Sequence, residues 1–437
     1  MIKIITGSVL IFVLFISSCQ TATPSKKEVG VEHIDEVLSQ STEMMIHDIS
    51  NPPLAMRFYA YICLAGYEVA SNYDKDLPNI KNSLNDYPKT EIADVPGSDA
   101  KLSTILAMSE VASQIQPSGF IMKDWKKKFI DSCINAGWSE EIVAKSHDYA
   151  KSVASKIMGY AKNDGYRTLS KYPRYAPKKT DSTWYATPPG YLPAVEPYFS
   201  KIRPFLVDSL DLENFKIPNP IPYSNDKSSE FFLSAKAVYE AGKEANGKET
   251  AAFWDCNPFA ISETGHLMVG LKKISPGAHW MGIAGIACAQ SKTSFNKSLL
   301  IYSSLSVNMM DGFWLCWKEK YRTDRIRPET AIRQLIDPSW KPFLQTPPFP
   351  EYPSGHSVVS STAATVLSHF FGKTYQYKDT VERRYGITDR SFNSFEEAAA
   401  EAGLSRFHGG IHFKDAIENG QILGTKMGTY GIKKLKL

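Results

Sequence analysis

The pattern of apolar positions along the chain predicts a mostly helical protein. The segment that starts at Pro52, "PPLAMRFYAYICLAGYEVAS", is almost continuously apolar, and its two prolines suit the first turn of a buried helix. Apolar residues recur at helical spacing near 101–114, 138–162 and 294–321, and again after Gly355. Runs that alternate between apolar and polar residues are few. We therefore predict an all-α fold in which long loops connect the helices of a bundle.

The first fifty residues are predicted to target and tether the protein. Lys3 precedes an apolar run too short to span a membrane, which is typical of a secretory signal peptide over residues 1–18. The sequence "ISSC" resembles a bacterial lipobox, so residues 19–50 would form a lipidated Cys19 and its tether. The alternative is an ordinary cleaved signal with an incidental cysteine. The lipoprotein hypothesis places the chain in a bacterial cell envelope, held to the membrane by lipid only and facing the periplasm or the exterior.

Two helical regions are predicted to follow, 51–225 and 226–437. The second begins where the helical pattern resumes near Ser228, after an irregular connection at 172–193 that is rich in Pro, Tyr and Gly. The composition, with 43% hydrophobic and 22% charged residues, is that of a folded protein. The sequence leaves the role of the first region open, including a face for a homo-oligomer.

Net charge and cysteine spacing exclude some classes of function. A net charge of +4 over 437 residues is small, so we predict no nucleic-acid partner. The cysteines beyond Cys19 are widely spaced and form no CxxC pair, which argues against a zinc site or a disulfide framework. We expect most of them to be buried small apolar residues.

One segment with candidate chemistry is "KYRTDRIRP", from Lys320 to Pro328. Trp317 and Lys320 are three residues apart near the end of a predicted helix, and hence lie on one face. Pro328 suits the first turn of the next helix, so Lys320 and Arg327 flank the loop between two helices. Taken alone, such a pair is usually a set of solvated surface charges.

Two further segments change that interpretation. "PSGH", Pro353–His356, precedes a helix whose first backbone N–H groups would be free to bind an anion, although Ser354 could simply cap it. "SRFHGGIHF" places Arg406 and His412 on either side of a glycine pair. Three cations, a glycine-containing helix start and two histidines together predict a site for a tetrahedral or bipyramidal oxyanion.

These motifs resemble the signature of vanadium-dependent haloperoxidases and type 2 phosphatidic acid phosphatases, K-x6-RP, PSGH and SR-x5-H-x3-D. The chain matches it from Lys320 to His412, but the final aspartate is replaced by Ala416 and Asp415 lies one residue early. His412 would then be supported by Asp415 or by a backbone carbonyl. The resemblance implies the helical-bundle fold of this superfamily.

The resemblance also implies roles for these residues around orthovanadate. His412 would be the axial ligand to the vanadium, and His356 the acid–base group on the opposite side. Lys320 would also polarise the peroxide. The residues that would bind the equatorial oxygens are Lys320, Arg327, Ser354, Gly355 and Arg406.

Haloperoxidase is the favoured activity, with hydrogen peroxide and iodide or bromide as small-molecule substrates. Trp317 and Phe349 resemble the aromatic residues that line the haloperoxidase pocket, Phe349 being typical of the chloroperoxidase branch. Asp255 would support Arg406, whereas His266 and His408 have no matched role and are expected to be structural. The alternative is a soluble acid phosphatase that binds phosphate in the same pocket and acts on phosphomonoesters through a phosphohistidine at His412.

Overall fold

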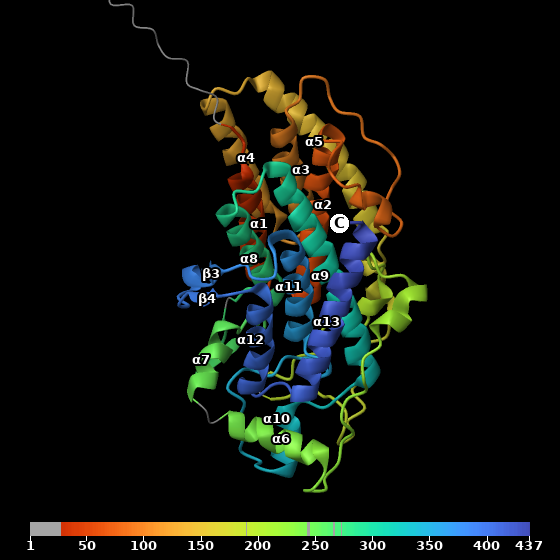
Figure 1. The fold of residues 1–437 in the computed structure, drawn as a ribbon, viewed down its shortest axis with the longest axis vertical. Helices are drawn as coiled ribbons and strands as arrows, with labels where there is room; N and C mark the ends of the chain where they lie inside the picture. Colours follow the sequence, from red (N-terminus) through yellow and green to blue (C-terminus); the bar gives the residue numbers. More distant parts are fainter. Residues whose placement is uncertain (1–27, 189, 243–244, 265–266, 272) are drawn as a thin grey trace, which may run out of the picture.

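A computed structural model describes residues 28–437, apart from 189, 243–244, 265–266 and 272 (Figure 1). The predicted signal peptide and Cys19 lie outside the described residues. Within the predicted tether, Val31–His47 forms helix α1 and buries Ile34, Val37 and Met44, so the tether prediction is wrong for these residues. Their spacing of three and seven residues is itself a helical pattern that the sequence interpretation overlooked.

The N-terminal half is a bundle of helices around α2, Pro52–Tyr73, which confirms the buried helix predicted there. The predictions near 101–114 and 138–162 are also confirmed. The helices at the upper end of the molecule in Figure 1 include α3, Ala100–Ile115, and α5, Glu140–Lys162, which both pack on α2. Helix α4, Gly119–Asn135, packs on α1, α3 and α5.

Helix α9, Phe295–Thr323, joins this bundle to the C-terminal half. It packs on α2 and also on α11, Gly355–Phe371, and α13, Lys414–Leu435. One apolar cluster accordingly extends from Val29 to Leu435. The predicted boundary near residue 225 therefore does not separate two hydrophobic cores.

The C-terminal helices enclose α11, whose residues are mostly buried. Glycines at every fourth position of α13 let the two backbones approach closely, since a Cβ on Gly424 would lie 2.3 Å from the Val358 carbonyl oxygen. The other helices of this half are α6, Glu230–Ala241, α7, Ala245–Phe253, α8, Pro276–Gln290, α10, Pro328–Leu335, and α12, Phe395–His408.

Two short antiparallel hairpins were not predicted. Strand β1, Ile261–Thr264, pairs with β2, Leu267–Gly270, and β3, Tyr377–Asp379, pairs with β4, Arg390–Phe392. The remaining helical turns are η1, Ile80–Ser83, η2, Tyr166–Lys171, η3, Phe199–Lys201, η4, Ser209–Phe215, and η5, Arg383–Tyr385.

The connection over 172–193 is irregular, as predicted. A loop that follows it is fixed to α9 from inside. The buried carboxylate of Asp311 accepts hydrogen bonds from the backbone N–H groups of Phe205, Leu206 and Val207 at 2.7, 2.6 and 2.9 Å. A buried carboxylate is stabilised by such donors, so α9 holds this loop over the core.

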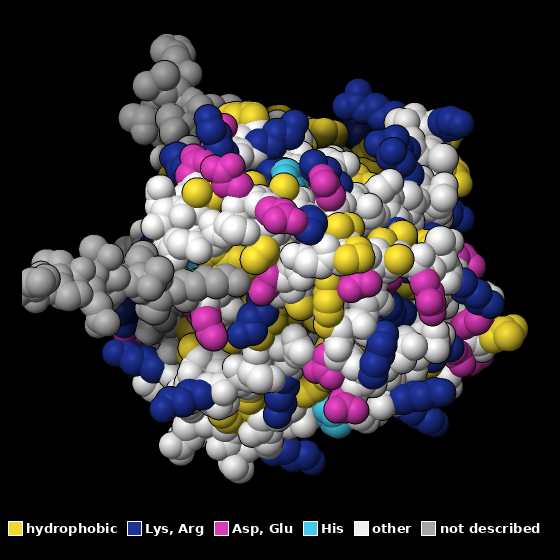
Figure 2. Space-filling view, turned by 90° about the horizontal axis from the view of Figure 1, so that it is seen from above, with side chains coloured by type: hydrophobic (Ala, Val, Ile, Leu, Met, Phe, Trp, Pro, Cys, Tyr) yellow, Lys and Arg dark blue, Asp and Glu magenta, His cyan; other side chains and the backbone are white. Residues whose placement is uncertain are grey.

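Charges of both signs lie next to one another over much of the face drawn in Figure 2. Among the helices of the described part of the chain, none combines the length and apolar character needed to cross a bilayer.

Candidate active site

The three sequence motifs meet at the centre of the C-terminal half. The last turns of α9 carry Trp317 and Lys320, the start of α11 carries Gly355 and His356, and the end of α12 carries Arg406. A small cavity is lined by Trp317, Phe349, Gly355, His356, Arg406 and His412, together with residues such as Phe313 and Cys256. The structure thus brings Gly355, His356, Arg406 and His412 to one cavity, whereas Lys320, Arg327 and Ser354 are not among the residues that line it.

His412 is oriented by a residue that the sequence interpretation missed. Its Nδ1 lies 2.8 Å from Oε1 of Glu351, which is fully buried and also accepts a hydrogen bond from the backbone N–H of Phe413. Because a carboxylate accepts, Nδ1 carries the proton and the lone pair is on Nε2. Nε2 lies 3.2 Å from Nη1 of Arg327.

Support of His412 by Asp415 or by a backbone carbonyl is therefore not what the structure shows. Asp415 instead accepts hydrogen bonds from Nη1 of Arg325 at 2.8 and 2.9 Å, and from the backbone N–H of Ile221. The same Nη1 donates to Oε2 of Glu351 at 3.2 Å. The signal in the sequence was an acidic residue within the apolar segment "PPFPEYP", because a buried carboxylate needs a partner.

Lys320 is fully buried and braces the segment before α11. Its ammonium group donates to the carbonyl oxygens of Pro350, Glu351 and Pro353 at 3.0, 2.9 and 2.6 Å. Burial lowers the pKa of Lys320 to about 7, and the adjacent Arg327 acts in the same direction. The three N–H groups are engaged by carbonyls, so donation by Lys320 to an anion stays a prediction that requires one of these bonds to be exchanged.

The two arginines are held by backbone carbonyls on one side only. Arg327 donates from Nε to Phe349 and from Nη1 to Ile411, while Arg406 donates from Nη1 to Trp254. Arg327 Nη2 and Arg406 Nε are buried and have no hydrogen-bond partner among the described residues. Burial lowers the pKa of Arg327 to about 10 and also lowers that of Arg406.

His356 lies in the first turn of α11, and its Nε2 is likewise buried without a partner. Burial lowers the pKa of His356 well below its usual value, and the charge of Arg406 adds to this effect. The pKa of His412 is lowered in the same way by burial and by Arg327 and Lys320. Both imidazoles are therefore neutral near pH 7, so one can offer a lone pair as a ligand and the other can accept a proton.

The prediction that the backbone N–H groups at the start of α11 are free to bind an anion is only partly right. Ser354 caps the helix, since its Oγ accepts a hydrogen bond from the backbone N–H of Ser357 at 3.3 Å. Its own backbone N–H donates to the carbonyl of Ala416 at 2.9 Å and is not a free donor. Gly355 lines the cavity, so its backbone lies beside the place where an anion would bind.

Asp255 does not hydrogen-bond to Arg406. Its carboxylate pairs with Lys273, and its charge acts on Arg406 only as a nearby negative group that favours the cationic form. The direct partner of Arg406 is the carbonyl of the preceding residue, Trp254. The segment that contains Asp255 therefore lies beside Arg406, as predicted, but the contact is made by the backbone carbonyl of Trp254 and not by the Asp255 side chain.

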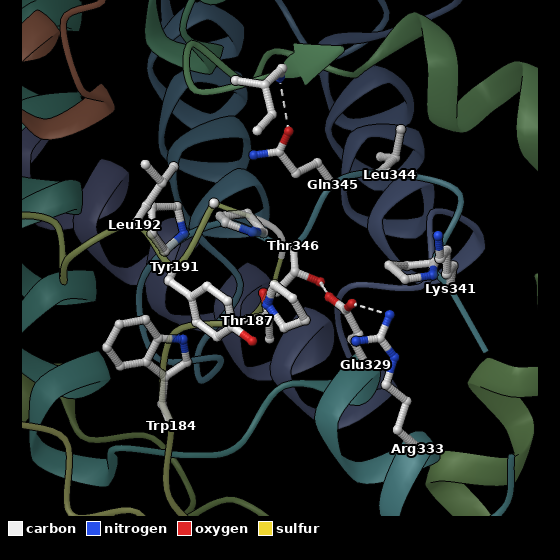
Figure 3. A pocket seen from close by; sticks show the side chains of 16 residues that line it. Trp184, Thr187, Tyr191, Leu192, Glu329, Arg333, Lys341, Leu344, Gln345 and Thr346 are labelled. Atoms are coloured by element: carbon white, nitrogen blue, oxygen red, sulfur yellow. Dashed lines mark hydrogen bonds and ion pairs between the residues drawn. The ribbon is translucent and has the colours of Figure 1, made fainter. Parts of the chain in front are cut away.

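A larger cavity of about 370 Å³ lies next to this site (Figure 3). Its lining includes Trp184, Tyr191 and Lys341, and Glu329 within it pairs with Arg333 at 2.8 Å. Pro347 lines both this cavity and the smaller one. The two spaces are thus separated by a short stretch of the segment that leads to Phe349.

The fold and site define a helical protein with a buried cationic pocket between two neutral imidazoles. Its architecture is similar to that of a bacterial vanadium-dependent iodoperoxidase, with 37% sequence identity and a TM-score of 0.86 over 93% of this chain and 97% of that one. The family model described as VCPO second helical-bundle domain matches residues 300–436. The chain belongs to the vanadium-dependent haloperoxidases, and it is a peroxidase of that family.

More distant structures share the fold. The holo form of a bacterial vanadium-dependent chloroperoxidase has a TM-score of 0.64 at 16% identity, over 89% of this chain and 93% of that one. An apo form of such a chloroperoxidase has a TM-score of 0.66 at 15% identity, over 87% and 93%. No curated protein sequence matches the chain.

Proposed function

We propose that the chain oxidises iodide with hydrogen peroxide and depends on vanadate held in the buried cavity. The observation that supports this most directly is a set of unpaired polar atoms at the cavity: His356 and Arg406 line it, and Arg327 contacts His412, which also lines it. Within the part of the chain that the structure describes, Arg327 Nη2, Arg406 Nε and His356 Nε2 are buried without hydrogen-bond partners. A buried polar group of this kind is costly unless a ligand satisfies it. An oxyanion supplies acceptors for the arginines, so the residues fit the group.

The same residues suggest how vanadate would be held. His412 Nε2 would be its protein ligand after exchange of the hydrogen bond that it accepts from Arg327 Nη1. Arg327 and Arg406 would donate to its oxygens, together with the backbone of Gly355 and, after exchange of a carbonyl partner, Lys320. When bound, vanadate activates hydrogen peroxide toward attack by a halide. The residues provide two arginine charges, and a lysine charge while Lys320 is protonated, against an anion in a buried space where electrostatic attraction is strong.

The chain's own contribution to catalysis is proton transfer and exclusion of water. His356 is neutral near pH 7 because burial and Arg406 lower its pKa, so Nε2 can take a proton from the incoming peroxide and return it later. Trp317 and Phe349 pack at a ring separation of 5.0 Å and form the apolar wall of the cavity. Glu351 keeps His412 in the tautomer that leaves Nε2 unprotonated.

Iodide is the halide that we propose, because the relative at 37% identity is an iodoperoxidase. The experiment is to load the purified full chain with vanadate and to measure peroxide-dependent oxidation of iodide, bromide and chloride. Hydrolysis of p-nitrophenyl phosphate is measured beside it. We expect vanadate-dependent oxidation, with a higher turnover for iodide than for bromide or chloride. Phosphate ester hydrolysis without any vanadate-dependent halide oxidation would contradict the proposal in favour of the acid phosphatase.

We also propose that the protein is a lipoprotein of a bacterial cell envelope, anchored through Cys19. The support is the "ISSC" sequence after a short apolar run. The test is to express the full chain and Cys19→Ser in a bacterium and to separate membrane from soluble fractions. We expect the wild-type chain in the membrane fraction and the variant released from it; an equal distribution of the two would refute the anchor.

A further inference from the structure

A second group of reactive side chains lies beside the anion cavity. Cys256, His279 and Glu382 are buried and come from the loop after α7, the first turn of α8 and the segment after β3. Cys256 Sγ lies 3.4 Å from His279 Nδ1 and 3.5 Å from Glu382 Oε1. The same carboxylate oxygen lies 3.3 Å from His279 Nδ1. A thiol, an imidazole and a carboxylate thus place their ligand atoms close together.

These separations are those that a tetrahedral metal site requires of its ligand atoms. A tetrahedral zinc ion with bonds of about 2.3 Å to sulfur and about 2.0 Å to nitrogen and oxygen requires its ligand atoms to lie roughly 3.3 to 3.6 Å apart. The three separations, 3.4, 3.5 and 3.3 Å, all fall inside that range. The nitrogen–oxygen distance of 3.3 Å, by contrast, exceeds the usual hydrogen-bond range of about 2.7 to 3.2 Å.

The other ring nitrogen of His279 is held as in a metal-binding histidine. Nε2 lies 2.7 Å from Oδ2 of Asp379, and both side chains are completely buried. A proton on Nε2 that is donated to this carboxylate leaves the lone pair on Nδ1, which faces Cys256 and Glu382. A carboxylate behind the imidazole is the usual arrangement for orienting a zinc-ligating histidine.

The charge of the cluster also accommodates a divalent ion. A thiolate at Cys256 and the carboxylate of Glu382 would together offset a charge of +2, and the carboxylate of Asp379 lies behind the imidazole of His279.

We propose that Cys256, His279 and Glu382 bind a zinc ion, with water as the fourth ligand. The mixture of thiolate, imidazole and carboxylate suits zinc. The ion would join the loop after α7 to α8 and to the β3–β4 hairpin. That loop supplies the Trp254 carbonyl to Arg406, and Cys256 itself lines the anion cavity. The zinc therefore has a positioning role for the wall of the active site, and is separate from the vanadate ligands.

The experiment measures metal content in the vanadate-free, untagged full chain after incubation with zinc and removal of the excess. We expect about one zinc ion per chain, and less than about a tenth of that in Cys256→Ala and in Glu382→Gln. Cys288→Ala is the matched control, because Cys288 is a buried cysteine on α8 that takes no part in the cluster. Replacement of zinc by cobalt(II) should give a thiolate-to-cobalt charge-transfer band that Cys256→Ser lacks.

A wild-type chain that takes up neither zinc nor cobalt while it oxidises iodide normally would overturn the zinc site and leave the proposed activity intact. Zinc retained in full by Cys256→Ala and Glu382→Gln would overturn the ligand assignment. If a variant fails to fold, the zinc and cobalt content of the wild-type chain still decides whether the site exists.

Discussion

Replacement of Glu351 by glutamine tests whether the carboxylate that accepts a hydrogen bond from His412 sets the affinity of the site for vanadate. The carboxylate accepts from His412 Nδ1 at 2.8 Å, from the Phe413 backbone and from Arg325. Glutamine keeps the shape but removes the charge, and its NH₂ group must face either His412 or the cationic Arg325. One of these hydrogen bonds is therefore lost or reversed, and the preference for a proton on Nδ1 of His412 is weakened.

The size of the effect follows from the type of bond. A hydrogen bond to a charged group contributes about 1.5 to 3 kcal/mol, against about 0.5 to 1.5 kcal/mol for a neutral pair. The loss is thus about 1 to 1.5 kcal/mol, which corresponds to roughly a tenfold weaker affinity for vanadate. Removal of such a partner behind a metal-binding histidine usually costs about 10- to 100-fold, which agrees.

The assay is reactivation of vanadate-free protein by increasing vanadate, followed through iodide oxidation. Glu351→Gln should need roughly ten times more vanadate for half-maximal activity. Asp415→Asn is the control, because Asp415 contacts Arg325 from the other side and does not touch His412. We expect a smaller shift for it. A folded Glu351→Gln protein with the affinity of the wild type would refute the assignment of Glu351 as the positioning residue.

Three further predictions follow, two from contacts at the site and one from a buried ion pair in the N-terminal half. His412→Ala should abolish retention of vanadium on gel filtration while His408→Ala retains it; equal retention would exclude His412 as the ligand. Vanadate affinity should fall by up to about tenfold per pH unit as the pH rises above about 7, because unliganded Lys320 then loses its proton and an anion favours the charged form. The vanadate affinity of Lys320→Met should not show this fall above pH 7. Identical pH profiles for the variant and the wild type would show that Lys320 does not cause it. Asp164→Ala should lower the free energy of unfolding by about 3 to 5 kcal/mol in urea, since it leaves the buried Arg57 without its 2.6 Å partner, whereas Asp148→Ala on the surface should have little effect.

The sequence allowed the site to be predicted to the extent that each motif carries its own local signal. Gly355 and His356 follow a helix-capping serine, and Arg406 and His412 flank a glycine turn, so all four could be placed from local spacing. Buried helices such as α2 were predicted because nearly every residue in them is apolar. Helix α1 was missed because its apolar face is broken by polar residues within a segment interpreted as a tether.

Contacts between distant residues could not be predicted in the same way. Glu351 was overlooked because its partner His412 is 61 residues away, and the expected support was sought beside His412 in sequence. Cysteine spacing argued against zinc, yet Cys256 meets His279 at a separation of 23 residues and Glu382 at 126. The N–H groups of Lys320 were predicted to bind an anion. That they donate to backbone carbonyls could not be predicted, because every residue has a carbonyl and the sequence does not show which ones lie nearby.

The most direct test of the central claim is to titrate the vanadate-free full chain with vanadate and to measure bound vanadium and iodide oxidation on the same samples. Both should saturate together at one vanadium per chain, and phosphate should displace the vanadium and suppress the activity in parallel. Iodide oxidation that reaches its maximum without bound vanadium, or vanadium bound with no gain in oxidation, would contradict the account.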